Sequence, residues 1–381
     1  MKLPRALAVA PVILLVALAA SACIGTENPQ GWASPVFDNN TVYFLQSKDR
    51  LGAAPITSTD QTITLDWSFP DKNRTEDKDI SLKAVYGEPV IDGDRLYFSS
   101  YSGGVFALNK TDGRPVWRMK DEIKGHVVGG VAVGANVLAF GTTDGHLYVV
   151  NKADKSPAPG WNAKGRSFGE EIWATPIIKG DTLYVATMGG DVHALSVKDG
   201  SELWEEPFHT SGAVPDITLM GDRLFVASLN RNLYEVSSAD GAEIGQFKAT
   251  DWVWTQPAFQ DDHAYFGDFA GKVYDVDITD MQNALWSLSL GDDRVKSSPG
   301  IVDNVLIVAD RQPTVHFIDI GPNANPEQRQ LNEVAPTAGG TIRADVAVHD
   351  GFAYLSTTKG KLLRADPKQR SVFEVLVGNR Q

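Results

Sequence analysis

Residues 174–195 read ATPIIKGDTLYVATMGGDVHAL, and the glycine pair near their end decides how the chain folds. Glycines before an apolar run can cradle a phosphate at a helix N-terminus, or they can close a hairpin. The run 191–195 after the pair alternates with the period of a strand, and no helix pattern follows it. We therefore predict that Gly189 and Gly190 form a hairpin tip and do not hold a cofactor.

The two apolar runs on either side of this glycine turn recur as a unit along the chain. A turn of Asp, Asn or Gly precedes an aromatic-rich run, and a second, often glycine-containing turn then leads into another run, as at 92–108 and 221–236. Each copy also has a first run that often ends in proline and a fourth run. Aligning the aromatic position gives eight copies spaced by 40 to 54 residues, at Tyr43, Tyr97, Ala139, Tyr184, Phe225, Tyr265, Ile307 and Tyr354. The fourth run is closed by tryptophan at Trp67, Trp117, Trp204 and Trp286. This pattern predicts an all-β fold, an eight-bladed β-propeller of four-stranded antiparallel blades.

The N-terminus has the features of an export signal. Lys2 and Arg5 precede an apolar stretch, 7–22, that is shorter than the roughly 20 residues of a membrane-spanning helix. Small residues before Cys23, the single cysteine of the chain, resemble a bacterial lipobox, in which this cysteine carries the lipid. We expect residues 1–22 to be a lipoprotein signal peptide, 23–31 a lipidated linker and 32–381 a single propeller domain. Secretion without a lipid is the alternative.

A lipid anchor predicts a place in the cell envelope. The protein would face the periplasm from the outer membrane of a cell with two membranes, and otherwise lie on the outer face of the cell membrane. The formal net charge of -13 argues against nucleic acid as a partner, because an acidic surface repels phosphates.

The repeat in residues 174–204 resembles that of pyrroloquinoline quinone (PQQ) propellers. Its pattern of small-Pro-apolar, Gly-Asp, apolar-Tyr, Gly, Ala-Leu, Asp-Gly and Leu-Trp recurs in degenerate form over residues 32–377. One branch of that superfamily contains quinoprotein dehydrogenases. The other contains the non-catalytic, BamB-like lipoproteins of the outer-membrane β-barrel assembly machinery. A lipobox followed by eight such repeats resembles the second branch, which implies protein partners in the cell envelope and contact with the membrane through the anchor.

The enzymes of the first branch require particular residues and ions, and these requirements can be compared with the sequence. Its soluble alcohol dehydrogenases stack PQQ under a disulfide of adjacent cysteines, and this chain has one cysteine. Its glucose-type enzymes need calcium, a catalytic acid and cations for the quinone carboxylates, and no such set can be assembled from matched motifs. Asp92 and Asp94, like Asp261 and Asp262, occupy repeated turn positions. We predict no catalytic residue, metal or cofactor, with a minimal PQQ and calcium dehydrogenase or a glycan- or peptidoglycan-binding propeller as alternatives.

The first runs of a propeller usually line its axial channel. Four aromatic residues stand three positions before a proline and would reach one level of that channel: Trp32, Tyr86, Trp173 and Trp254. Nearby polar residues of the same runs are Glu88, Gln256, Arg343 and Asp345. We predict these eight residues as contacts for a ligand or a peptide. The alternatives are that the rings pack as core between blades and that Arg343 pairs with Asp345.

Overall fold

The computed structural model describes residues 29–291, 293–325 and 328–378. The predicted signal peptide and Cys23 therefore lie outside the described residues. Within the described chain the only helical segment is a single 3-10 turn, Thr75–Asp77. No helix in this part of the chain is long and apolar enough to cross a membrane.

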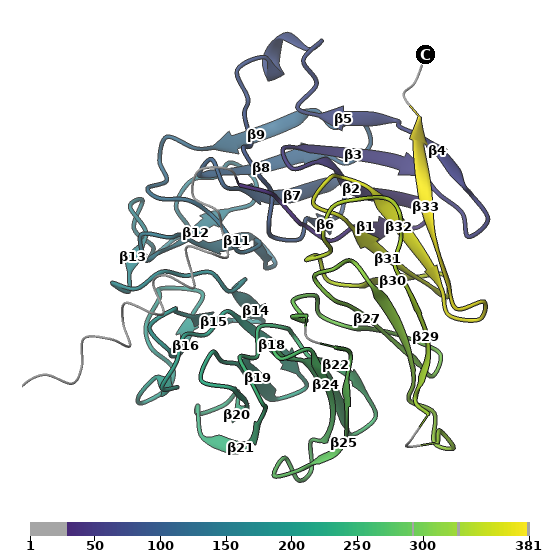
Figure 1. Ribbon diagram of the computed structural model, residues 1–381. Coiled ribbons are helices and arrows are strands. Elements are labelled where there is room, and N and C mark those ends of the chain that lie inside the picture. The colour runs from purple at the N-terminus through teal and green to yellow at the C-terminus, as the bar shows by residue number, and fades with distance from the viewer. Residues whose placement is uncertain (1–28, 292, 326–327, 379–381) are drawn as a thin grey trace, which may run out of the picture.

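The structure confirms the predicted eight-bladed propeller. Eight antiparallel sheets lie around a central axis, and each takes its four main strands from one repeat (Figure 1). Blades one to four consist of β1 (Val36–Asp38), β2 (Thr41–Ser47), β3 (Arg50–Pro55) and β5 (Trp67–Phe69); β6 (Val90–Asp92), β7 (Arg95–Ser100), β8 (Gly104–Asn109) and β9 (Pro115–Met119); β10 (Ala132–Val133), β11 (Val137–Gly141), β12 (His146–Asn151) and β13 (Arg166–Ser167); and β14 (Ile177–Lys179), β15 (Thr182–Ala186), β16 (Asp191–Ser196) and β17 (Phe208–His209).

The second half of the ring repeats this order. Blades five to eight consist of β18 (Asp216–Met220), β19 (Arg223–Ala227), β20 (Asn232–Ser237) and β21 (Glu243–Lys248); β22 (Ala258–Gln260), β23 (His263–Gly267), β24 (Lys272–Asp277) and β25 (Ala284–Ser289); β26 (Gly300–Val302), β27 (Val305–Ala309), β28 (Val315–Asp319) and β29 (Gln330–Val334); and β30 (Ala347–His349), β31 (Phe352–Ser356), β32 (Leu362–Asp366) and β33 (Ser371–Gly378).

The glycine pair at 189–190 forms the predicted hairpin. It connects β15 to β16, whose register pairs Ala186 with Val192, and no helix follows. Gly190 has φ +101°, and a Cβ there would lie 2.7 Å from the main-chain oxygen of Thr210, so glycine is required on both grounds.

The prediction that first strands end in proline is wrong. The prolines stand directly before these strands, as Pro89 does before β6 and Pro176 before β14. Proline has no N–H to donate to a sheet ladder, so it marks where pairing begins. The residues before each proline are therefore free of strand pairing and lead in from the axis.

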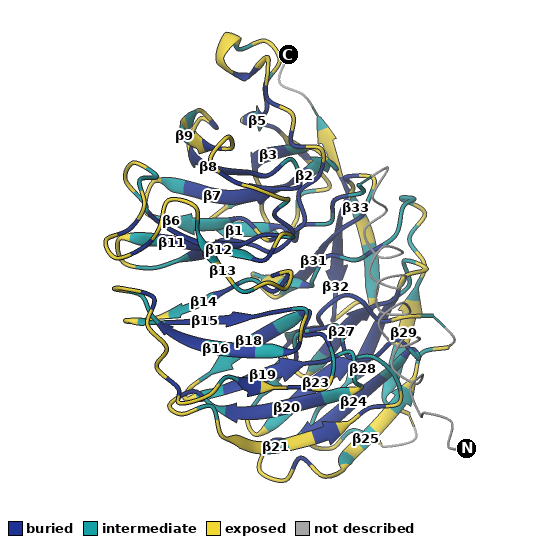
Figure 2. Ribbon diagram, turned by 90° about the vertical axis from the view of Figure 1, so that its left-hand side faces the viewer, coloured by how far each residue is buried: buried dark blue, intermediate teal, exposed yellow. Residues whose placement is uncertain are grey.

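The core lies between blades. One apolar cluster joins Leu45 and Phe69 of blade one to Leu96 and Phe98 of blade two. In Figure 2 the inner strands are buried, whereas the peripheral β21 and β25 are largely exposed. Each blade thus buries its two faces against its neighbours, as in other propellers.

An additional strand closes the ring. β4 (Thr62–Thr64), which lies between β3 and β5 in the sequence, pairs in parallel with the C-terminal strand β33, with Ile63 opposite Val377. The Leu376 N–H donates to Gln61 O at 2.9 Å and the Leu65 N–H to Gly378 O at 3.2 Å. Blade eight thereby becomes a five-stranded sheet that contains a strand from the first repeat.

The predicted tryptophans join neighbouring blades. Trp67 Nε1 donates to Lys110 O at 2.9 Å, and Trp117 Nε1 donates to Lys152 O at 2.9 Å, in each case in the next blade. The Trp67 ring packs on Gly113 of that blade, where an added Cβ would lie 2.3 Å from the ring. Trp161, which the sequence analysis did not identify, makes the same type of bond to Val197 O at 2.6 Å.

Trp204 makes this contact from outside a strand. The prediction that it closes a fourth strand is wrong, because Trp204 lies in the bend that precedes β17. Its Nε1 still donates to Ser238 O, at 3.2 Å. The contact therefore depends on the position of the ring against Tyr184, 6.0 Å between centroids, and not on strand pairing.

The seam between blades six and seven departs from this pattern. Trp286 packs on Tyr265 at 6.1 Å, but its Nε1 has no hydrogen-bond partner in the part of blade seven that the structure describes. A longer connection between β28 and β29 replaces the short turn, and Arg329 lies 4.8 Å over the Trp286 ring. A hollow of about 490 Å³ remains here.

Candidate functional site

The axial cavity is built from two positions in each repeat. In the segment that leads into each first strand, which in blade five includes the first residue of β18, residues two apart point to the same side of the extended chain. The position nearer the strand is held by Ser34, Glu88, Gly130, Thr175, Asp216, Gln256, Ser298 and Asp345, and the other position by Trp32, Tyr86, Val128, Trp173, Val214, Trp254, Lys296 and Arg343. All but Gly130 and Val214 line one cavity of about 120 Å³.

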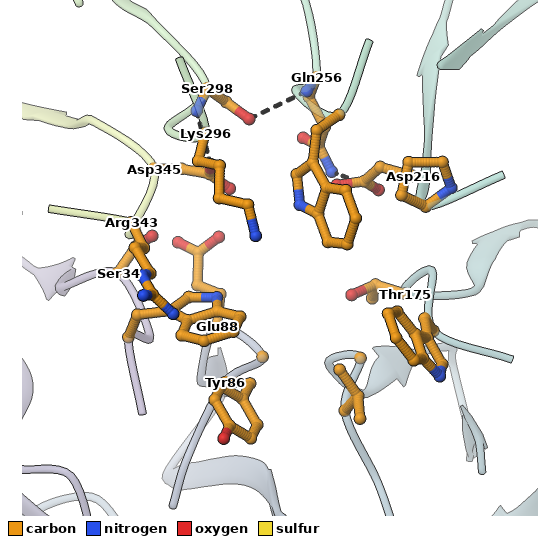
Figure 3. A pocket seen from close by; sticks show the side chains of 17 residues that line it. Ser34, Tyr86, Glu88, Thr175, Asp216, Gln256, Lys296, Ser298, Arg343 and Asp345 are labelled. Carbon is orange, nitrogen blue, oxygen red and sulfur yellow. Dashed lines mark hydrogen bonds between the residues drawn. The ribbon is translucent and has the colours of Figure 1, made fainter. Parts of the chain in front are cut away.

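The structure brings all eight predicted residues to this cavity (Figure 3). The sequence analysis missed five polar residues that also line it: Ser34, Thr175, Asp216, Lys296 and Ser298. Their signal was present in the sequence, because each occupies one of the same two repeat positions. Ser34 and Thr175 stand directly before Pro35 and Pro176, whereas Asp216, Lys296 and Ser298 lie in blades where the aromatic residue or the proline is replaced.

The four predicted aromatic side chains pack on one another as well as lining the cavity. Trp32 lies 4.2 Å from Tyr86, and Trp173 lies 6.3 Å from Trp254, between ring centroids. Tyr86 and Trp173 are 5% and 7% exposed, whereas Trp32 and Trp254 are partly buried. The rings are therefore part of the core and also form the wall of the cavity.

Hydrogen bonds connect the polar residues from blade to blade. Ser298 Oγ accepts the Gln256 N–H at 2.9 Å, and Asp345 Oδ1 accepts the Ser298 N–H at 2.7 Å. Gln256 Nε2 donates to Asp216 Oδ1 at 2.9 Å (Figure 3). Thr175 Oγ1 accepts the Gly130 N–H at 2.8 Å. These bonds fix the side chains around the cavity, and those given for Asp216 use only its Oδ1.

Three carboxyl groups share this confined space. Burial, with a smaller contribution from the charge of Asp345, raises the pKa of Glu88 to about 7. Burial also raises the pKa of Asp216 to about 7, although the hydrogen bond from Gln256 opposes the shift. The pKa of Asp345 is raised by burial as well. Part of the Glu88 side chain is exposed, but the residue lines the cavity and is closely surrounded by protein. The surrounding protein removes water from the carboxyl group and so disfavours its charged form.

Two cations line the same cavity. Lys296 is 7% exposed, with Nζ 4.3 Å from the Trp254 ring centre and 5.8 Å from that of Trp32. The Arg343 guanidinium lies 5.3 Å over Trp32. The lining thus combines three carboxyl groups, two cations and four aromatic rings.

The residues present do not fit PQQ. A quinone with three carboxylates needs cationic partners, whereas this lining has more carboxyl groups than cations. The volume of about 120 Å³ is also below the 300–1,000 Å³ or so of typical ligand pockets. Among the described residues, no group of three or more His, Cys, Asp or Glu side chains could hold a metal ion. Asp92 and Asp94 flank the turn between β6 and β7, as predicted.

The repeated blades and the axial cavity define the class: a propeller built from PQQ-type repeats. Within that class, the chain belongs to the family described as outer membrane protein assembly factor BamB, whose profile matches residues 31–158, 102–206 and 158–373. The predicted resemblance is thereby confirmed.

Curated relatives carry two kinds of name. Outer membrane protein assembly factor BamB from Shewanella oneidensis is 23% identical over 291 residues, which is 73% of this chain and 60% of that protein. Quinoprotein ethanol dehydrogenase from Pseudomonas aeruginosa is 27% identical over 186 residues, which is 46% of this chain. This chain spans 28% of the length of that dehydrogenase, and the same share of the BamB of Burkholderia pseudomallei.

Solved structures agree with the fold. BamB from Moraxella catarrhalis superposes with a TM-score of 0.66 at 14% identity, covering 87% of this chain and 93% of that one. The computationally designed Ika8 protein gives a TM-score of 0.68 at 12% identity over 90% of this chain and 96% of that one. At such identities the likeness concerns the fold alone.

Proposed function

We propose that this protein is a non-catalytic, lipid-anchored scaffold that binds other proteins of the cell envelope during the assembly of outer-membrane β-barrel proteins. The observation that carries the proposal is the match of the BamB family profile across residues 31–373. The proposal includes residues 1–22 as signal peptide, Cys23 as lipidation site and an outer-membrane location facing the periplasm. No cofactor is part of it.

The peripheral strands supply a surface for protein partners. Ile244 on β21, Leu285 on β25 and Leu376 on β33 are 55%, 56% and 55% exposed, and each belongs to the outermost strand of its repeat. Exposed apolar side chains on a closed, rigid ring favour binding to other proteins, because the scaffold loses little conformational entropy when it binds.

The dehydrogenase alternative has one supporting observation, the similarity to quinoprotein ethanol dehydrogenases over less than half of the chain. The carboxyl-rich lining formed by Glu88, Asp216 and Asp345 weighs against it, because these groups would repel the carboxylates of the quinone. A titration of the mature protein with PQQ and calcium tests this alternative. Quinone binding with reduction of a dye in the presence of an alcohol or sugar would overturn the non-catalytic part of the proposal.

Crosslinking in the cell tests the proposed scaffold function. A photo-crosslinking residue at Ile244 or Leu285 is expected to capture components of the β-barrel assembly machinery. The same residue at Asp181, an exposed position in the turn between β14 and β15, is the control and is expected to give weaker capture. Capture of periplasmic redox proteins, or retention of the mature protein on peptidoglycan without any assembly component, would contradict the proposal.

A further inference from the structure

We propose that the axial cavity binds one small organic cation, an ammonium or guanidinium group, held by Glu88, Asp216 and Asp345 against the aromatic wall. The inference does not rest on the scaffold function. A free amine and a Lys or Arg side chain inserted by a partner present the same chemistry to the cavity.

The three carboxyl groups surround the cavity. Glu88 comes from blade two, Asp216 from blade five and Asp345 from blade eight, so they face the axis from different sides of the ring (Figure 3). Each of Asp216 and Asp345 has one oxygen committed to a hydrogen bond between blades. Glu88 lines the cavity together with Asp345, whose charge adds to the effect of burial in raising the pKa of Glu88. Carboxyl groups that face one another across a confined space repel each other when ionised, and a cation between them would offset that repulsion and donate charge-assisted hydrogen bonds.

The aromatic wall shows which type of ligand it favours, because it already holds a cation. Lys296 Nζ lies 4.3 Å from the ring centre of Trp254 and 5.5 Å from that of Phe269. Aromatic faces attract ammonium and guanidinium groups, and this attraction strengthens when water is excluded. A second cation in the cavity would lie among the same rings, Trp32 and Trp254, and the carboxyl groups that line it.

The balance of charge leaves room for one positive charge. Glu88 shares the cavity with Asp216, Asp345, Lys296, Arg343 and the neutral Tyr86. With all three acids ionised, the lining carries three negative and two positive charges. One monovalent cation would neutralise it, and so would one proton. Because the pKa of Glu88 and that of Asp216 are raised to about 7, the ligand and the proton compete near neutral pH.

Size and geometry favour an organic cation over a metal ion. The cavity of about 120 Å³ has room for about four water molecules, which suits a methylguanidinium or methylammonium ion. A calcium ion needs several oxygens at about 2.3–2.6 Å. The described carboxyl groups form no cluster that could hold a metal.

Calorimetric titration of the mature protein with methylguanidinium and with methylammonium at pH 8 tests the proposal. We expect saturable binding, with affinity at least about tenfold weaker in Glu88→Gln. Lys296→Met should have the opposite effect and strengthen binding severalfold, because it removes the competing internal cation. Asp222→Asn, which alters an exposed carboxyl far from the cavity, is the matched control and should leave the affinity unchanged. Thermal unfolding confirms that each variant is folded.

The two charge variants, Glu88→Gln and Lys296→Met, are expected to change the affinity for cations in opposite directions. Weaker cation binding in Lys296→Met, or unchanged binding in Glu88→Gln, would overturn the proposal, and so would the absence of binding to the folded wild-type protein at millimolar ligand. A site for anions would show itself by saturable binding of acetate that Lys296→Met abolishes, which also overturns it. Tighter binding of a Gly-Arg-Gly peptide than of methylguanidinium would indicate a partner's side chain, and the reverse order would indicate a free small molecule. Either order supports an organic-cation site.

Discussion

Trp67 Nε1 donates a hydrogen bond of 2.9 Å to the main-chain oxygen of Lys110, and this bond joins the outer edge of blade one to blade two. Equivalent bonds run from Trp117, Trp161 and Trp204 to the next blade. Trp286 keeps the position of the ring but lacks this bond within the described chain. The repeat therefore provides a comparison between the same residue with and without its contact to the next blade.

Replacing these tryptophans by phenylalanine should separate the contribution of the hydrogen bond to stability from that of ring packing. Trp67→Phe and Trp117→Phe each remove a partly buried donor and leave a main-chain oxygen without its partner, so we expect the free energy of unfolding to fall by about 1–2 kcal/mol. Trp286→Phe should cost clearly less, because it removes no bond between blades. Urea denaturation of the three variants measures the difference. Equal losses in all three would show that the bond contributes little.

The strand β4, which pairs with the C-terminal strand, offers a second matched pair of variants. Ile63 in β4 is 3% exposed and packs in the cluster that joins blades eight and one, while its neighbour Thr62 is exposed. Ile63→Asp should destabilise the protein by at least about 3 kcal/mol, because it buries a charge in that seam. Thr62→Asp should stay within about 0.5 kcal/mol of wild type. Limited proteolysis is expected to cut the first variant near β4 and β33, and equal resistance of the two variants would contradict the role of β4.

The axial carboxyl groups predict how stability changes with pH. The pKa of Glu88 and that of Asp216 are about 7 in the folded protein, above their ordinary values near 4 in an unfolded chain. Between these values the folded state binds more protons than the unfolded state, so these two groups make stability fall as pH rises from about 4 to about 7. The double variant Glu88→Gln and Asp216→Asn should lose less stability between pH 5 and 8 than wild type. Unfolding curves at four pH values measure this slope, with Asp222→Asn as control. An unchanged slope in the double variant would show that these carboxyl groups titrate normally.

Replacing Cys23 tests whether a lipid on this residue anchors the protein to the membrane. If it carries the lipid, Cys23→Ser should move the protein from the membrane fraction to the soluble envelope fraction, because a chain held by acyl groups loses about 0.8 kcal/mol of binding for each CH₂ removed from the bilayer. Fractionation followed by immunoblotting makes the measurement. Retention of the variant in the membrane would show that another part of the protein, or a bound partner, holds it there.

The sequence was informative where a signal is local and repeated. Hairpins, aromatic positions and the tryptophans Trp67 and Trp117 recur with each blade, so one repeat predicts the others. Lys296 and Asp216 were missed because they replace the aromatic residue and precede no proline, although they occupy the same repeat positions. Their approach to Glu88 depends on the closure of the ring, which no local pattern describes.

Other features could not be predicted because they depend on distant packing. At the seam between blades five and six, Gly245 stands where other blades have tryptophan, and Met281 of the next blade fills the space. Large and small residues are exchanged across the seam, which a search for tryptophan does not detect. β4 is three residues long, and its partner lies about three hundred residues further along the chain.

The pairing of β4 with β33 also has a consequence for how the chain is made. Synthesis runs from the N-terminus, so Ile63 emerges from the ribosome long before Val377, and β4 has no partner until the last repeat has been made. Intermediate chains carry an open blade at each end, with apolar faces that no neighbour covers. A chain that stops before Ser371 lacks the eight-residue strand that pairs with β4, so the apolar side chains of that seam, including Ile63, would be open to chaperones and proteases.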